Sequence, residues 1–566
     1  MKVRDLSEYF EKLENTSSRI EITKILAVLF KRIGADEIDK AVYLSLGILA
    51  PSFKGIVFNL AERMMVKVIS LAYNTAPEEV VRKYKTKGDL GLVVYELAEN
   101  KKSSLTVTGV YNKLVEIARD EGGGSVERKI SATAQLLKNL DPVSAKFVAR
   151  IPVGKLRLGF SDKTVIDSLS WMETGDKSKS KTLEAAYQVL PDVGKLAYEV
   201  RKSGVEKASK NITPKIGIPV MPMLPQRLKI PEEMIKKMGK VAVEPKFDGL
   251  RVQIHFQKGQ PVKSFTRNLN EISEMFPELN SIGKYLKVKN TILDSEAVGL
   301  DAETMKMVDF QTTMNRRRKH DIAKSAKKTP LTFQIFDVLL VNGKSMMGKD
   351  YGKRRKLLKK IIRPNRNFVV DEFLLTSNPG EIRTKHHELL KQGLEGAIIK
   401  KVESGYAPGR TGWRWVKMKE VEEASGKLAD TIDAVVMGYS SGRGKRASFG
   451  IGQFLAGVRR ADRLVTITKV GTGLTDEQFS QLYKRLRSIK VGNKPKEYEV
   501  HKDLEPDFWV ISEVVVELAA DEITRSPKHT AGYALRFPRL VKFRGDKSAN
   551  QATTLGEVKK LYKLQR

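Results

Sequence analysis

A lysine placed directly before an Asp-Gly pair is the residue best suited to covalent chemistry in this sequence. Lys246 stands in Glu244-Pro245-Lys246-Phe247-Asp248-Gly249, after a short apolar run and at a turn signal. A lysine amine that has lost its proton is a nucleophile, so the segment could carry covalent catalysis. The string Lys-x-Asp-Gly is weak evidence alone, because a lysine-rich chain produces it by chance and a surface turn explains it equally well.

Further segments with charged or aromatic residues follow Lys246 in a fixed order. Five of them lie before residue 420: Thr266-Arg267-Asn268, Leu293-Asp294-Ser295-Glu296, Phe333-Gln334-Ile335-Phe336-Asp337, Glu395-Gly396-Ala397-Ile398-Ile399-Lys400 and Trp415-Val416-Lys417-Met418-Lys419. Two more lie near the C-terminal end of the sequence: Leu535-Arg536-Phe537-Pro538-Arg539 and Arg544-Gly545-Asp546-Lys547.

Composition restricts the class of protein further. The 566 residues carry a net charge of +35, which favours a polyanionic partner such as nucleic acid. A ribosome-associated or acid-tolerant protein with a generally basic surface is the alternative. The absence of cysteine excludes disulfides, zinc ribbons and thiolate catalysis. No apolar run approaches the roughly 20 residues that span a bilayer, so we expect a cytoplasmic protein without a membrane segment.

Periodicity divides the chain into a helical part and two parts with strands. Apolar residues at helical spacing predict a helix after Ser18, with Glu21 completing a capping box and Gly34 as its C-terminal stop. Residues 91–100 and 108–120 show similar patterns. No strand-like alternation dominates before about residue 210, and the proline-rich residues 211–231 read as a linker.

The strand signals lie beyond that linker. Val252, Ile254 and Phe256 alternate with polar residues, and the apolar run 333–341 ends at an Asn-Gly turn signal. A helix is expected over 354–362 between the strands. From about residue 420, short strands at 434–437, 454–458, 464–470 and 509–518 fit a small β-barrel, followed by a basic helix at 555–564.

The motifs resemble those of the ATP-dependent DNA ligases of archaeal and eukaryotic replicative type, within the covalent nucleotidyltransferases. Residues 141–171, which include Gly154-Lys155-Leu156-Arg157-Leu158-Gly159, resemble the helical DNA-binding domain of those ligases, so the resemblance spans nearly the whole chain. It implies an all-α DNA-binding domain at 1–212, an α+β adenylation domain at 213–421 and an all-β OB-fold at 422–566. These divisions agree with the segmentation by periodicity.

The resemblance implies a three-step reaction on nicked duplex DNA. A lysine attacks the α-phosphate of ATP, the AMP passes to the 5′-phosphate of the nick, and the 3′-hydroxyl displaces AMP. Lys246 matches the nucleophile. A free lysine has a pKa near 10.4 and is an ammonium at neutral pH, so nearby positive charge that disfavours protonation is needed. Lys400, Lys417, Lys419 and a bound metal could supply it.

The remaining site residues are carried over by the same resemblance. Glu296 and Glu395 match the metal-binding acids, and Mg²⁺ (or Mn²⁺) needs only one or two carboxylates beside phosphate oxygens and waters. Asp248 shapes the turn beside the nucleophile. The nucleotide contacts are assigned as follows: Glu244 flanks the adenine, Phe336 stacks on it, Arg251 and Arg267 contact sugar or phosphate, and Glu296, Lys417, Lys419 and Arg544 complete the nucleotide site. The alternative for Phe336 is an ordinary core side chain, since it lies in an apolar strand.

The C-terminal motif and the DNA contacts complete the expected machinery. Arg544 and Lys547 would orient the pyrophosphate of ATP and then swing away about a hinge at 419–424. Phe310 and Phe537 match aromatics that press into the minor groove, although each could be a core residue. Lys155 and Arg157, in a glycine-bearing turn, are expected to contact DNA phosphates, with a solvated basic turn as the alternative.

Other readings are less consistent with the sequence. NAD-dependent ligases carry a cysteine zinc site, capping enzymes lack the long helical region, and RNA ligases commonly lack such an OB-fold. A non-catalytic nucleic-acid-binding protein with a dead core is opposed by the intact motif residues. The sequence does not distinguish ATP from ADP or GTP as the nucleotide. It also does not distinguish Mg²⁺ from Mn²⁺ as the metal. A sliding clamp is a candidate partner, although residues 101–106 lack paired aromatics, and we expect a monomer associated with the nucleoid.

Overall fold

The computed structural model describes residues 1–566 except 155, 211, 319, 364, 410–411, 420–430, 443–448, 473 and 566. The chain forms two compact units. The first comprises residues 1–80 and 90–421, and the second comprises residues 422–566 together with 81–89. The domain boundaries at 212 and 421 stay a prediction from the sequence.

The N-terminal region is helical. Its elements are α1 (Val3–Glu14), α2 (Arg19–Arg32), α3 (Ala35–Leu46), η1 (Ser52–Lys54), α4 (Glu62–Tyr73), α5 (Pro77–Lys87), α6 (Leu90–Leu97), α7 (Val107–Arg119), α8 (Ser125–Lys138), α9 (Pro142–Arg150), α10 (Asp162–Thr174), α11 (Ser180–Val189) and α12 (Val193–Ser209). The local sequence explains where several of these helices begin. Ser18 caps α2 by accepting from the Glu21 amide, and Asp141 caps α9, with Pro142 in its first turn.

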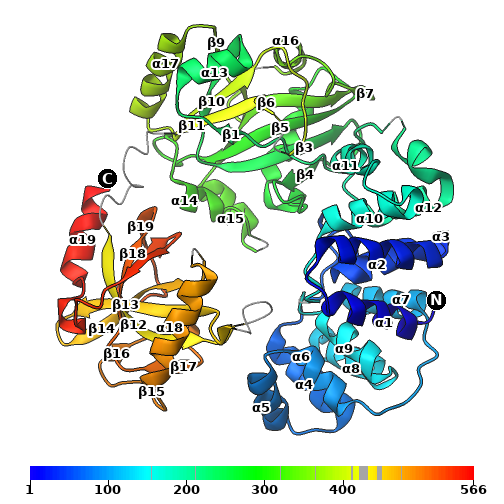
Figure 1. The fold of residues 1–566 in the computed structure, drawn as a ribbon. Coiled ribbons are helices and arrows are strands. Elements are labelled where there is room, and N and C mark those ends of the chain that lie inside the picture. Colours follow the sequence, from blue (N-terminus) through cyan, green and yellow to red (C-terminus); the bar gives the residue numbers. More distant parts are fainter. Residues whose placement is uncertain are drawn as a thin grey trace. The chain divides into compact units, whose positions relative to one another are not determined.

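The central region contains two sheets with helices on their outer faces (Figure 1). Its elements are β1 (Gln226–Arg227), α13 (Pro231–Met238), β2 (Val241–Lys246), β3 (Leu250–Gln257), β4 (Lys263–Thr266), η2 (Ser273–Met275), η3 (Pro277–Lys284), β5 (Asn290–Gly299), α14 (Phe310–Met314), α15 (Ile322–Lys328), β6 (Leu331–Val341), β7 (Lys344–Ser345), α16 (Tyr351–Ile361), β8 (Phe368–Val370), β9 (Leu374–Thr376), α17 (Pro379–Lys391), β10 (Gly396–Lys401) and β11 (Trp415–Lys419).

The first sheet has the order β1-β11-β10-β2-β9, and its two faces differ in character. Val243 of β2, Ile399 of β10 and Val416 of β11 belong to one buried cluster with residues of α13 and α17. The alternate positions carry polar groups. In the strand register, Ile398 lies opposite Glu244 on one side and opposite Lys417 on the other. These residues therefore share the opposite, inner face of the sheet.

The second sheet has the order β4-β3-β5-β6-β7 and repeats this division. Val252, Leu293 and Phe333 pack with α16 and η3 on the outer face. In the register of β3 and β5, Arg251 lies opposite Glu296, and Gln253 lies opposite Asp294. These polar residues therefore share the inner face of the sheet. A third cluster, which includes Ile292 of β5 and Trp415 of β11, joins the inner faces of the two sheets. The polar motif residues therefore come together between the sheets.

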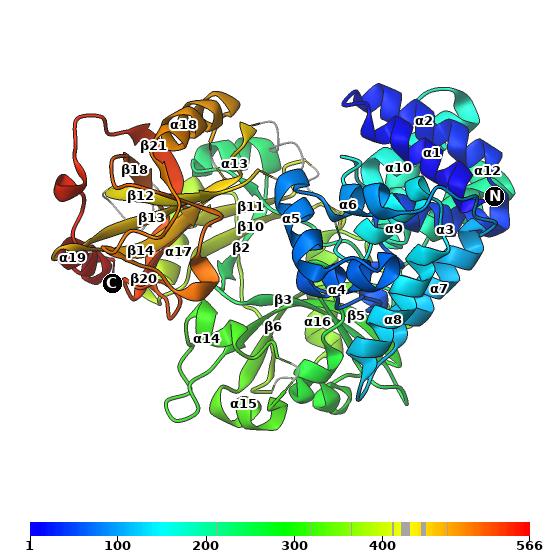
Figure 2. The same cartoon turned by 90° about the horizontal axis from the view of Figure 1, so that it is seen from below.

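The C-terminal unit is β-rich. Its elements are β12 (Ile432–Ser440), β13 (Gln453–Arg460), β14 (Arg463–Val470), α18 (Asp476–Ser488), β15 (Lys490–Val491), β16 (Tyr498–Glu499), η5 (Lys502–Leu504), β17 (Phe508–Val510), β18 (Val515–Ala519), β19 (Glu522–Arg525), β20 (Tyr533–Arg536), β21 (Arg539–Phe543), η6 (Ala549–Gln551) and α19 (Leu555–Leu564). Figure 2 shows β12, β13 and β14 side by side. Both α18 and α19 contribute buried residues to the core of these strands.

Most expected elements are present, with three local differences. Gly34 does not stop α2 in a left-handed conformation: its φ is −68°, and it begins α3 instead. Residues 509–518 form two strands, β17 and β18, which pair with different parts of β12. The helix α18 was not expected from the sequence, although Thr475 and Gln478 form a capping box at its start.

No helix in the described ranges is long and apolar enough to cross a membrane.

Candidate functional site

Lys246 ends β2 on the inner face of the first sheet. Its ammonium forms an ion pair with the carboxylate of Glu395, and the two side chains are 19% and 24% exposed. The main chain reinforces the contact, because the Glu395 amide donates to the Lys246 carbonyl at 3.1 Å. Gly396 then opens β10 directly opposite Lys246. The fold thus places an acid beside the candidate nucleophile and keeps both accessible to solvent.

A second acid, Glu296, lies on β5 close to the same lysine. Burial raises its pKa to about 8, the positive charges of Lys246 and Arg251 oppose this rise, and the negative charge of Asp294 adds to it. A nearby cation would stabilise the ionised form of a carboxyl in such surroundings. The described residues contain no group of three or more His, Cys, Asp or Glu side chains that could hold a metal. The assignment of Glu296 and Glu395 as ligands of a divalent cation stays a prediction from the sequence.

Gly249 brings the loop after Lys246 against β5. A Cβ on Gly249 would lie 2.5 Å from the carbonyl oxygen of Ala297 and 3.0 Å from Cγ of Glu296. Asp248, beside it, is exposed in the bend between β2 and β3. The glycine in the Lys-x-Asp-Gly motif is thus required by close packing of backbone against backbone.

Replacing Gly249 by alanine should displace the nucleophile loop. We expect Gly249→Ala to lower the free energy of unfolding by about 1–3 kcal/mol through overpacking. The rate of self-adenylation should fall by at least about tenfold, because an error of about 1 Å in the position of a reacting group costs up to 100-fold. Gly348→Ala is the matched control, since nothing lies within 4 Å of a Cβ there. Equal activity of the two variants would contradict the packing argument.

Glu244 and Lys400 form an ion pair deep between the sheets. Each is 2% exposed, and Lys400 Nζ contacts Glu244 Oε2. Burial lowers the pKa of Lys400, an effect that the charges of Glu244 and Asp337 oppose. Lys400 also lies 4.5 Å from the ring centroid of Phe336 and 4.4 Å from that of Trp415. The structure therefore joins Lys400 to Glu244, the residue expected to border the adenine.

Phe336 is half-buried among charged and aromatic groups. Its ring packs edge to face on Trp415 at 5.9 Å, and the guanidinium of Arg251 lies 5.5 Å from its centroid. The ring packs against a core cluster that includes Trp415, and its stacking on adenine stays a prediction.

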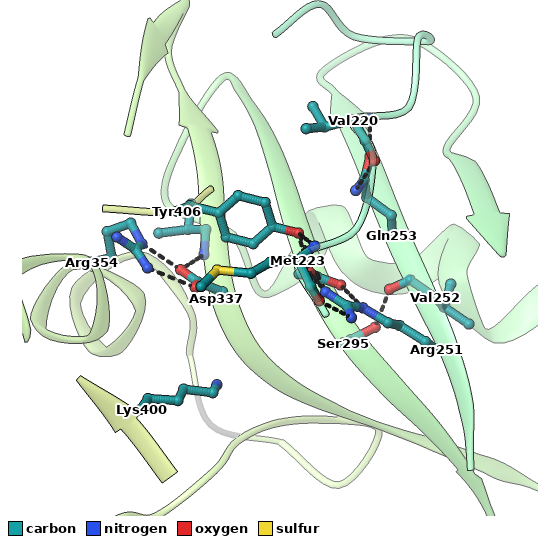
Figure 3. Close-up of polar contacts among 12 residues, drawn as sticks. Val220, Met223, Arg251, Val252, Gln253, Ser295, Asp337, Arg354, Lys400 and Tyr406 are labelled. Atoms are coloured by element: carbon teal, nitrogen blue, oxygen red, sulfur yellow. Dashed lines mark hydrogen bonds and ion pairs between the residues drawn. The ribbon is translucent and has the colours of Figure 1, made fainter. Parts of the chain in front are cut away.

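Arg251 is held by an extensive polar network (Figure 3). Its guanidinium donates two hydrogen bonds to Asp294, at 3.0 and 2.6 Å, and a third to the carbonyl of Met223 at 2.6 Å. Tyr406 donates to Asp294 at 2.9 Å and accepts from the Met223 amide at 2.9 Å. Burial disfavours the guanidinium charge, but Asp294 outweighs it, so the pKa of Arg251 is raised. This network fixes residues 219–223 against the second sheet.

The other expected nucleotide contacts lie around these groups. Arg267 is exposed in the turn after β4 and, with Arg251 and Asp294, lines a small pocket. Lys417 is half-buried on the inner face of β11, in register with Ile398 and, through it, with Glu244. The backbone of Lys419 pairs with Gly396 opposite Lys246, and its side chain lies outside the described residues.

In the C-terminal unit, Arg544 and Lys547 bind acidic groups of the same unit. Arg544 Nη1 lies 3.0 Å from Oδ1 of Asp433, and Lys547 Nζ lies 2.5 Å from its Oδ2. Arg544 also pairs with Asp546 at 2.7 Å. The hydrogen bonds to Asp546 and the charge of Asp433 raise the pKa of Arg544. The expected hinge at 419–424 falls largely on residues 420–430, outside the described residues.

The candidate DNA contacts differ in exposure. Phe537 is 60% exposed, with a left-handed φ of 51°, in the turn between β20 and β21. Phe310 is half-buried at the start of α14. Arg157 is half-buried with a φ of 64°, between the buried Leu156 and Leu158. Lys155 lies outside the described residues.

Sequence reasoning missed several residues that build the site. Tyr406 and Arg355 lie outside the recognised motifs, and Asp294 was quoted within a motif without a role. Only Asp294 left a signal, as an acid that directly follows the apolar pair Ile292-Leu293 and precedes a second acid, Glu296, by two residues. Asp371 and Arg355 are buried charges in segments whose pattern does not predict their burial.

Comparisons with known proteins agree with this architecture. The chain matches three protein families: "DNA ligase N terminus" over residues 2–170, "ATP dependent DNA ligase domain" over 222–419, and "ATP dependent DNA ligase C terminal region" over 447–547.

Named relatives match along the whole chain. A "Probable DNA ligase" of Dictyoglomus turgidum is 39% identical, over 99% of this chain and 97% of the relative. A "DNA ligase" of Saccharolobus solfataricus is 36% identical, over 100% and 98%. A solved structure named "Pmar-Lig_Pre." has a similar fold, with a TM-score of 0.57 at 17% identity over 95% of this chain and 99% of that one. The chain therefore belongs to the ATP-dependent DNA ligases, which seal nicks in duplex DNA through adenylate intermediates.

Proposed function

We propose that Lys246 forms the covalent adenylate through which this ATP-dependent ligase seals nicked duplex DNA. The observation that carries the proposal is the position of its amine, at the end of β2 and paired with an acid. The amine must leave Glu395 and lose its proton before it attacks the α-phosphate. Attack forms a phosphorus–nitrogen bond and releases pyrophosphate, and the AMP then passes to the 5′-phosphate of the nick.

Glu296 and Glu395 fit a divalent cation, which we propose is Mg²⁺, with Mn²⁺ as a substitute. Their carboxylates lie close to the nucleophile, and burial is the main cause of the raised pKa of Glu296. Such a cation supplies charge neutralisation for the phosphates. Glu395 would serve either as the partner of Lys246 or as a ligand of the cation, and in the second case the amine would be released from this carboxylate. Lys417, half-buried on the inner face of β11, and Lys419 at the end of the same strand would stabilise charge developing on the α-phosphate.

The nucleotide base and sugar are assigned to the inner faces of the two sheets. Glu244 would border the adenine, and Phe336 would stack on it, since its ring is half-buried beside Arg251. Arg251 acts chiefly by holding the wall of this site, because its donors already bind Asp294 and Met223. Arg267 is exposed beside it and remains the candidate for direct sugar or phosphate contact.

Arg544 and Lys547 would orient the pyrophosphate during the first step. Both cations bind Asp433, so a phosphate group would replace this carboxylate as their partner. After adenylation the C-terminal unit would move and hold DNA. A hinge at 419–424 is retained as part of this proposal.

For DNA, we propose contacts from Lys155, Arg157, Phe310 and Phe537. Phe537 is the best-supported wedge, because a large aromatic side chain is 60% exposed in a turn with a left-handed backbone. The working form is proposed to be a monomer near the nucleoid. A sliding clamp is a candidate partner.

The wedge assignment predicts a separation of steps. We expect Phe537→Ala to weaken binding of nicked duplex by about tenfold, from the loss of stacking and contact worth about 1–3 kcal/mol. Self-adenylation should be unchanged. Leu564→Ala is a matched control, because this side chain is 81% exposed in the same unit. Normal nick affinity in Phe537→Ala would remove the wedge assignment.

The proposed function is tested by labelling and chase. Wild-type protein with α-³²P-labelled ATP and Mg²⁺ should acquire a covalent, acid-labile label, which nicked duplex discharges to give a sealed strand. Label that only nicked RNA discharges would reassign the acceptor. The absence of label with ATP, followed by label with ADP, GTP or NAD, would reassign the nucleotide.

A further inference from the structure

Four buried charges meet between the two sheets, away from the reacting atoms. They are Glu244 of β2, Lys400 of β10, Arg355 of α16, and Asp371 in the segment between β8 and β9, and none is more than 4% exposed. Two are acids and two are bases, so the cluster is balanced in formal charge. Removal of one member would leave an uncompensated buried charge, which is strongly destabilising.

Arg355 connects this cluster to the main chain of two elements. Its Nη1 donates to the carbonyl of Ile335 at 3.1 Å, and its Nη2 donates to the carbonyl of Asp371. The guanidinium lies 5.0 Å from the ring centroid of Phe373. These contacts fix the guanidinium plane. Its Nε is thereby held 3.5 Å from Oε1 of Glu244.

The two oxygens of Glu244 have different surroundings. Oε2 pairs with Lys400, whereas Oε1 accepts no hydrogen bond within the described part of the chain. A buried acceptor without a donor destabilises the fold, because it has lost its hydrogen bonds to water. A bound group that presents a donor to Oε1 would recover this energy, and a group that presents an acceptor would be repelled.

We propose that Arg355 is a positioning residue for base selection, which holds Glu244 so that Oε1 receives the exocyclic amino group of adenine. The inference rests on the proposed role of Glu244 beside the adenine. Adenine carries an N–H donor at position 6, where hypoxanthine carries a carbonyl oxygen. A carboxylate oxygen fixed by Lys400 and Arg355 distinguishes these two groups by charge and hydrogen-bond direction.

Self-adenylation with ATP and with inosine triphosphate measures this selection directly. For full-length protein we would determine kcat and KM for both nucleotides, with the melting temperature, in wild type and in Arg355→Gln. The ratio of kcat/KM for ATP to that for inosine triphosphate should fall at least about tenfold, equivalent to about 1.4 kcal/mol. The change should lie in KM for ATP, with kcat largely retained, because Arg355 does not touch the reacting atoms.

Arg354→Gln is the control for a purely structural effect. Arg354 is adjacent on α16 and as fully buried, but it pairs with Asp337 at 2.7 and 2.9 Å. It should lower the melting temperature and leave the nucleotide ratio unchanged. Where Arg355→Gln does not fold, Arg355→Lys keeps the charge, loses the paired main-chain contacts, and is compared in the same way with Arg354→Lys.

Glu244→Gln distinguishes the role inferred for Arg355 from the proposed role of Glu244 beside the adenine. A ratio that falls in Glu244→Gln and Arg355→Gln but not in Arg354→Gln supports the proposal. A ratio that falls in Glu244→Gln alone overturns the role of Arg355 and leaves the proposed function intact. A ratio unchanged in Glu244→Gln overturns the placement of Glu244 at the base, and the role of Arg355 with it.

Discussion

Lys246→Ala is expected to take up no label from α-³²P-labelled ATP, with self-adenylation reduced by at least about 1,000-fold. Alanine lacks the amine that is proposed to bond to the α-phosphate. The neighbouring cations Lys400 and Lys417 do not replace it, because Lys400 is buried in its pair with Glu244, and Lys417 occupies a different strand. Denaturing gel electrophoresis after incubation with Mg²⁺ measures the label.

A pre-adenylated nick provides the internal control for Lys246→Ala. Its 5′-phosphate already carries AMP, so only the final displacement by the 3′-hydroxyl remains. The variant should bind this substrate and close it, which would show that the fold and the DNA site are intact. Label on Lys246→Ala at the wild-type level would place the nucleophile elsewhere.

Glu296→Gln should have the second-largest effect. The substitution keeps the size of the side chain and removes the charge that a divalent cation would neutralise. We expect kcat/KM for self-adenylation to fall by about 100-fold, the scale of losing one electrostatic contact to a reacting phosphate. Rates measured across a titration of Mg²⁺ should also require a higher metal concentration for half-saturation.

Substitution of an exposed acid in the same region is the control for Glu296→Gln. Glu303 lies in an exposed turn after β5, and Glu303→Gln changes the net charge by the same amount. It should leave both the rate and the metal dependence unchanged. An unaltered metal requirement in Glu296→Gln would remove Glu296 from the metal site, whatever the loss in rate.

Much of the fold follows from local sequence, because the periodic elements are also the buried ones. Val252, Ile254 and Phe256 were expected on one face of a strand, and they lie in the core of the second sheet. Asn342 and Gly343 were expected to form a turn, and both have positive φ between β6 and β7. Such features depend on neighbours in sequence, which alternation and turn chemistry report directly.

The motifs singled out the candidate site residues, but they did not indicate which side chains those residues contact. The sequence marked Lys246, Glu395 and Glu296 as important, yet it could not indicate that the first two form an ion pair. It also placed Lys400 among charges for the nucleophile, whereas the fold buries it against Glu244. Arg355 and Tyr406 escaped notice, since their roles arise from contacts between segments far apart in the chain. Long-range pairing of this kind leaves no periodic trace.

The alternation of β2, β10 and β11 has a consequence for how the protein tolerates insertions and deletions. Odd and even positions of these strands serve two separate purposes: one set packs on α13 and α17, and the other carries Glu244, Lys246, Lys400 and Lys417. A slip of one residue would exchange the two sets, burying ammonium groups among methionines and exposing valines to the nucleotide. Gain or loss of a single residue within these strands would therefore abolish stability and chemistry together, whereas a pair of residues would preserve the phase.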